Sequence, residues 1–156
     1  MPRELVYFSP TLSPRDYRRE VSAIFSRELS RQGLRLTSQR RRILDELMKT
    51  DRHLSEEEIY RSLASSGIGR TTVFRTLKVL KECRLVEQVS GTDRPRFELR
   101  WERPHHDHLV CISCGHIQEV RWPKLEAIQE KTCRKIGFAP KWHRHEIFGL
   151  CAACSR

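Results

Sequence analysis

Two Cys-x-x-Cys pairs, Cys111 with Cys114 and Cys151 with Cys154, have the residue type and spacing of a metal site. A thiolate pair on such a turn supplies two corners of a tetrahedron, and a second pair completes a closed zinc site with bonds of about 2.3 Å. Disulfides and unpaired core cysteines are the alternatives. We favour structural zinc, because the N-terminus lacks the charged and then apolar pattern of a secretory signal and we expect an intracellular protein.

Three histidines and an aspartate, His105, His106, Asp107 and His108, precede the first cysteine pair. Neutral imidazole with carboxylate suits Fe(II), Mn(II) or Zn(II), and coordination geometry and metal availability choose among these ions. On a strand, His106 and His108 would face one side and His105 and Asp107 the other. One short segment can therefore supply ligands to two sites, with a solvated histidine-rich loop as the alternative.

The elements before residue 100 predict a winged helix-turn-helix. Thr37 caps one helix, Ser55 with Glu58 forms a capping box for the next, and a third helix follows from Thr71. Two short β-prone runs, 85–89 and 96–100, are separated by a polar turn and predict a hairpin. Three helices and a hairpin make a winged helix, although such patterns also occur in ordinary protein scaffolds.

The helix from Thr71 carries an inward apolar stripe and leaves Arg70, Thr72, Arg75 and Thr76 for its other faces. In a helix-turn-helix protein this helix enters the major groove, where arginine pairs with guanine and apolar groups meet thymine methyls. Arg94 and Arg96 on the wing would reach phosphates. The predicted DNA-binding residues are Arg35, Arg40, Arg70, Thr71, Thr72, Phe74 and Arg75.

The net charge favours an anionic partner. Among 156 residues, 30 are Lys or Arg and 20 are Asp or Glu, which gives +10. Most of the surplus lies before residue 105. No apolar run approaches the roughly 18 residues of a membrane span, so we expect no membrane partner. A solvated surface is the other reading of the charge.

Residues 105–156 have the pattern of a small α+β unit. Strands are predicted at 108–112 and 116–120, a helix from Pro123 to Gly137, and a strand over 141–150 that leads into the second cysteine pair. A further helix, from Pro14 to about Gln32, packs on its own domain or on a dimer partner, or serves as a DNA arm. Because one winged helix reads a half-site, we expect a homodimer, or a higher oligomer, on palindromic DNA.

Three segments, LRLTSQRRRIL, GRTTVFRTL and PHHDHLVCISCG, resemble the ferric uptake regulator (Fur) family of bacterial metal-sensing repressors over about residues 33–154. The resemblance implies an α+β protein with a winged-helix DNA-binding domain at 33–100, a hinge at 101–104, and a dimerisation and metal-binding domain at 105–156. The N-terminal helical extension, 1–32, is unusual for the family.

The resemblance also implies two sets of metal ligands beyond the cysteines. A regulatory site between the domains matches His53, Glu98, His106, His108 and Glu119. An additional site in the dimerisation domain matches His105, Asp107, Glu126 and His143. The chain departs from the family pattern in having Phe74 where Tyr is usual, one residue inserted between Phe97 and His106, which bears on the placement of Glu98, and a compact final cysteine pair.

The expected function is that of a cytoplasmic bacterial repressor that binds operator DNA of iron uptake genes when loaded with Fe(II), for which Mn(II) or Zn(II) can substitute. Peroxide-sensing and Zn/Mn-sensing members are the alternatives within the family. Zinc sensors tend to add a cysteine ligand, which residues 86–109 lack, and peroxide sensors typically carry Asp at the position of Glu119.

An enzyme is not expected, because the chain has neither a His-Glu-x-x-His nor a deaminase His-x-Glu pattern, and a four-thiolate site has no open position. A zinc-stapled interaction module without regulatory metal is the alternative from another class. Cys83 and Cys133 lie in predicted helices and are interpreted as core residues.

Overall fold

The computed structural model describes residues 14–89, 94–100 and 105–156. Contacts divide these residues into two units, one formed by 14–89 and 94–100 and the other by 105–156. The hinge predicted at 101–104 and most of the predicted wing turn lie outside the described residues. None of the described helices has the length and hydropathy needed to cross a membrane.

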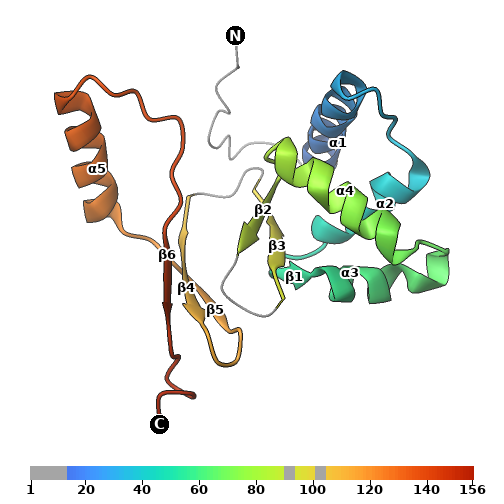
Figure 1. Cartoon of the computed structure of the whole chain (residues 1–156). Helices are drawn as coiled ribbons and strands as arrows, with labels where there is room; N and C mark the ends of the chain where they lie inside the picture. The colour runs from blue at the N-terminus through green and yellow to red at the C-terminus, as the bar shows by residue number, and fades with distance from the viewer. Residues whose placement is uncertain (1–13, 90–93, 101–104) are drawn as a thin grey trace. The chain divides into compact units, whose positions relative to one another are not determined.

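The first unit is a winged helix-turn-helix with an additional helix, α1, that precedes it in the sequence (Figure 1). Its elements are α1 (Pro14–Arg31), α2 (Ser38–Leu47), β1 (Leu54–Ser55), α3 (Glu56–Leu63), the 3₁₀ turn η1 (Ala64–Ser66), α4 (Arg70–Glu82), β2 (Val86–Val89) and β3 (Arg96–Leu99). The strands form an antiparallel sheet in the order β1-β3-β2. The sequence did not predict β1, because two residues are too few to show a period.

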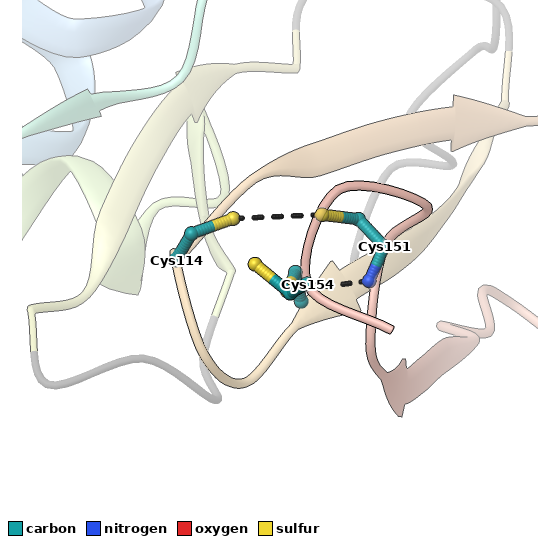
Figure 2. A group of neighbouring side chains, drawn as sticks. Cys114, Cys151 and Cys154 are labelled. Atoms are coloured by element: carbon teal, nitrogen blue, oxygen red, sulfur yellow. Dashed lines mark hydrogen bonds between the residues drawn. The ribbon is translucent and has the colours of Figure 1, made fainter. Parts of the chain in front are cut away.

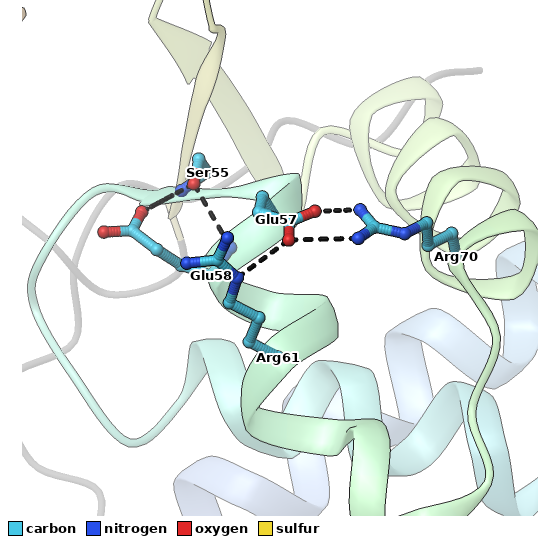
Figure 3. Close-up of polar contacts among 5 residues, drawn as sticks. All are labelled: Ser55, Glu57, Glu58, Arg61 and Arg70. Carbon is cyan, nitrogen blue, oxygen red and sulfur yellow. Dashed lines mark hydrogen bonds and ion pairs between the residues drawn. The ribbon is translucent and has the colours of Figure 1, made fainter.

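Local hydrogen bonds explain where the helices of this unit begin. The Thr37 hydroxyl accepts the Arg40 N–H at 3.3 Å, and Ser55 and Glu58 form the predicted reciprocal capping box at the start of α3 (Figure 3). Gly67 has a φ of 70°, which closes the turn between α3 and α4. The last helix begins at Arg70, one residue before the predicted start at Thr71.

Helix α1 belongs to the core of the first unit. Val21, Phe25 and Leu29 are fully buried in one cluster with the apolar residues of α2, α3 and α4. Thr76, which the apolar period left on an outer face of α4, is also buried. Its hydroxyl donates to the Thr72 carbonyl at 2.7 Å, so the polar atom keeps a partner inside the protein.

The second unit contains β4 (Asp107–Cys111), β5 (Ile117–Val120), α5 (Pro123–Lys135) and β6 (Glu146–Gly149). The sheet has the order β5-β4-β6, with β4 antiparallel to β5 and parallel to β6. Strand β6 is shorter than the predicted 141–150.

None of the residues of α5 is buried. Large apolar side chains are exposed across this unit, namely Ile112, Trp122, Ile128, Ile136, Phe138, Trp142, Ile147, Phe148 and Leu150.

Replacing Phe25 by Ala should lower the free energy of unfolding by about 3 to 5 kcal/mol, because a fully buried aromatic ring would leave a cavity in the core of the first unit. Urea unfolding followed by circular dichroism measures the change. The matched control is Arg27→Ala on the exposed side of the same helix. A loss below about 1 kcal/mol for Phe25→Ala would show that α1 is not part of the folded core.

Candidate functional site

The two cysteine pairs meet in the second unit. One ligand atom from each of Cys111, Cys114, Cys151 and Cys154 lies within 4.8 Å of the others. The sulfur atoms of Cys114 and Cys151 are 3.7 Å apart (Figure 2). The Cys151 N–H donates to the Cys111 sulfur at 3.3 Å. The parallel pairing of β4 with β6 brings the two turns together, because each cysteine pair begins where one of these strands ends.

This cluster fits a tetrahedral zinc ion. Bonds of about 2.3 Å place neighbouring sulfurs about 3.8 Å apart, close to the observed separation. Hydrogen bonds from the backbone N–H groups of Cys114 and Cys151 lower the pKa of Cys111 to about 6. The His116 N–H acts to lower the pKa of Cys114, but the three neighbouring cysteines outweigh it and raise that pKa to about 12. The protein alone therefore resists a second thiolate charge beside Cys111, and a divalent cation would offset this repulsion.

A second group of ligand-type side chains comes from the start of β4, from α5 and from the segment before β6. His105 Nε2 is 3.2 Å from Asp107 Oδ1 and 3.3 Å from Glu126 Oε1. His143 Nε2 is 3.1 Å from the same Glu126 oxygen. These spacings match the ligand separations of a small divalent ion bonded at about 2.1 Å. The other oxygen of Asp107 is buried without a hydrogen-bond partner among the described residues, so the group has unused capacity as an acceptor.

The first unit holds a buried imidazole and carboxylate. His53 Nε2 lies 3.5 Å from Glu98 Oε2, and the two side chains are 9% and 2% exposed. Antiparallel pairing explains their proximity, because His53 immediately precedes β1, which pairs with the strand that carries Glu98. A buried carboxylate next to an imidazole is a ligand pair suited to a divalent ion.

The second unit holds three more ligand-type side chains. The rings of His106 and His108 lie with their centroids 4.9 Å apart, and His106 Nε2 is 3.8 Å from Glu119 Oε1. Strand pairing places Glu119 opposite His108. The strand begins only at Asp107, yet contacts follow the predicted alternation, with His106 beside His108 and His105 beside Asp107.

The predicted DNA-binding residues occupy two places in the first unit. Thr71, Phe74 and Arg75 are exposed on α4 at helical spacing, with Phe74 54% exposed, while Thr72 is half-buried. Arg35 and Arg40 lie before and within the first turn of α2, where the Arg40 guanidinium donates to the Arg35 carbonyl at 2.6 Å.

Two arginines have protein partners that the sequence did not predict. The Arg96 guanidinium donates to the His53 carbonyl at 2.9 Å and to Glu58 at 3.1 Å, so it braces the wing against α3. Arg70 forms an ion pair with Glu57. An i, i+4 pairing of Glu57 with Arg61 was readable from the sequence, but the contact with Arg70 depends on how α3 and α4 pack.

Residues 31–148 match the family model described as "Ferric uptake regulator family". The ferric uptake regulation protein of Bordetella parapertussis is 36% identical over 83% of this chain and 95% of its own length. The peroxide operon regulator of Bacillus subtilis is 31% identical over 82% and 89%. The ferric uptake regulator of Francisella tularensis, solved with iron, is 28% identical with a TM-score of 0.67 over 80% of this chain and 96% of that one.

Replacing Cys111 by Ser should reduce bound zinc to a small fraction of the wild-type amount and destabilise the second unit, because a hydroxyl is a poor zinc ligand. Metal analysis of the purified protein and thermal unfolding measure both effects. Cys133→Ser is the matched control, since Cys133 is a half-exposed thiol outside the cluster. Unchanged zinc content and unchanged unfolding temperature in the Cys111 variant would contradict a zinc site at these cysteines.

Proposed function

The chain belongs to the ferric uptake regulator family of metal-responsive transcription regulators, and we propose that it is an Fe(II)-dependent repressor of iron uptake genes in the bacterial cytoplasm. Two incomplete ligand sets, one in each unit, support this proposal. His53 and Glu98 offer two ligands, and His106, His108 and Glu119 offer three. Either set alone is small for a divalent ion of this class, which prefers four to six ligands.

We infer that the two sets bind one regulatory ion together. A site shared in this way is complete only in an arrangement that brings both units to the same ion. Metal binding would then stabilise that arrangement by the difference in affinity between the complete and the divided site. The metal concentration would therefore determine the orientation of the winged helices. That orientation would in turn determine the affinity for operator DNA.

Iron as the physiological signal is supported by the ligand types and by the relatives. Imidazole and carboxylate ligands suit Fe(II) and Mn(II), and no cysteine is among them. The related peroxide operon regulator makes oxidant sensing the second candidate. By the family resemblance, Glu119 in place of Asp favours iron sensing over peroxide sensing.

We propose that the exposed face of α4 recognises operator DNA. Arg75 is positioned on this face to pair with a guanine, and Phe74 can contact a thymine methyl with its exposed ring. The surplus of positive charge would attract the phosphate backbone. Because Phe74 has no hydroxyl, contact through its ring is apolar.

A homodimer is proposed through β6 and the apolar side chains around it. This strand forms the edge of its sheet, so one side of its backbone lacks a strand partner within the described residues. Ile147, Phe148 and Leu150 are each about half exposed there. An exposed apolar edge strand is a surface that proteins usually cover, and antiparallel pairing with the same strand of a second copy would cover it.

Replacing His53 by Ala should abolish most of the metal-dependent gain in DNA affinity while leaving the zinc content unchanged, because it removes a ligand from the regulatory set only. Fluorescence anisotropy of a palindromic duplex, enriched from random sequences by the Mn(II)-loaded protein, measures affinity during an Mn(II) titration. His116→Ala is the control, because His116 is exposed and outside all four groups of ligand-type side chains. A wild-type response in the His53 variant would refute the shared regulatory site.

Replacing Ile147 by Glu should weaken dimerisation by roughly 30- to 100-fold, since it places a charge where an apolar side chain is proposed to be buried. Sedimentation equilibrium measures the dimer dissociation constant. Phe74→Ser, which removes an exposed apolar side chain from the other unit, should leave it unchanged. A monomeric wild type, or equal dimerisation in the Ile147 variant, would contradict a dimer built on β6.

A further inference from the structure

One carboxylate, Glu57 on α3, holds two arginine side chains. Its Oε1 accepts from Arg61 Nε at 2.8 Å and from Arg70 Nη2 at 3.1 Å, and its Oε2 accepts from Arg70 Nη1 (Figure 3). The contact with Arg70 is therefore bidentate, the geometry that fixes a guanidinium most firmly. Glu57 is 20% exposed, whereas Arg61 and Arg70 are 75% and 60% exposed.

The aromatic ring of Tyr60 also contacts the Arg70 guanidinium. The Arg70 Cζ lies 4.1 Å from the centroid of the Tyr60 ring, within the range of a cation–π contact. The ring and the carboxylate thus both hold the guanidinium in place. An arginine offers five N–H groups, so Nε–H and one N–H on each terminal nitrogen remain for another acceptor on the exposed side.

This clamp lies where a helix-turn-helix meets the DNA backbone. Arg70 is the first residue of α4, and Glu57, Tyr60 and Arg61 belong to α3. In this motif the first helix crosses the backbone, and the N-terminal residues of the second approach the groove. The positive end of the α4 dipole adds to the attraction for an anion at the same place.

We propose that Glu57 is a positioning residue, which together with Tyr60 orients the Arg70 guanidinium to bind a DNA phosphate at the junction of α3 and α4. This inference rests on the proposed DNA-binding function and adds to it a residue whose charge argues against DNA contact. A long arginine side chain loses rotamer freedom when it is ordered. The clamp orders it before DNA arrives, so less affinity is lost on binding.

Charge alone and positioning make opposite predictions for Glu57→Gln. Removing a negative charge beside the DNA would strengthen binding if only the net charge mattered. If Glu57 orients Arg70, its loss frees the guanidinium and weakens binding although the protein becomes more positive. The sign of the change therefore separates the two explanations.

The experiment measures anisotropy of the palindromic duplex with Mn(II)-loaded protein at several salt concentrations. Glu57→Gln should weaken binding by about 5- to 10-fold, and the slope of log K against log salt should become shallower by about 0.9, the equivalent of one phosphate contact. Arg70→Met should show the same two changes, and the double variant should lose no more than Arg70→Met alone.

Two controls separate positioning from other effects. Glu46→Gln removes a carboxylate of α2 that pairs with Lys49, just beyond the helix, and should not weaken binding. Thermal unfolding of Glu57→Gln shows whether the helix-turn-helix itself is weakened.

Unchanged or tighter binding by Glu57→Gln overturns the inference while leaving the proposed repressor function standing. Further loss in the Arg70→Met background also overturns it, because Glu57 would then act without Arg70. A fall in the unfolding temperature that accounts for the whole loss of affinity counts against positioning as well. If the Mn(II)-loaded wild type fails to bind DNA, the proposed function and this inference both fail.

Discussion

The four cysteine sulfurs meet where β4 and β6 end, and a zinc ion bound there would stabilise the rest of the second unit. Within its described residues no side chain of α5 is buried, and only a few around β4 are. A hydrophobic core of this size contributes little stability, and domains near 50 residues usually need a metal, disulfides or a partner. The thiol cluster fixes β4 beside β6 at their C-terminal ends. The histidines lie at the start of β4, so zinc would stabilise the strand that carries the proposed regulatory ligands.

The first unit is stabilised differently, by burial. Helix α1 contributes Val21, Phe25 and Leu29 to a continuous apolar core. The buried residues of α4 belong to the same core. Capping bonds set the start of α3, and the Arg96 contacts with Glu58 and the His53 carbonyl connect the wing to that start. Burial alone would raise the pKa of Glu58, but hydrogen bonds from Ser55 and the charge of Arg96 outweigh it and lower that pKa. These contacts connect the backbone carbonyl of His53 to the start of α3.

Much of the fold could be predicted from the sequence, because its signals are local. The Thr37 and Ser55 caps, the Pro123 start of α5 and the Cys-x-x-Cys turns were all readable. The burial of Thr76 was not, because a hydroxyl that bonds to its own helix is invisible to an apolar period. The Glu57 clamp was also missed, because it depends on how two helices pack. The structure brings together the four cysteines and the four residues of the His105 group, whereas their roles as ligands and the sharing of the regulatory ion between units stay predictions.

In the proposed mechanism one divalent ion, distinct from the structural zinc, controls affinity for DNA. The most direct test is to measure anisotropy of the palindromic duplex with zinc-loaded wild-type protein while Fe(II) is added without oxygen, and with Mn(II) in parallel. We expect weak binding without added metal. Added metal should raise the affinity at least about tenfold, a gain typical of coupling between two sites. The gain should saturate near one ion per chain. Equal affinity for the duplex with and without the added ion would contradict this mechanism.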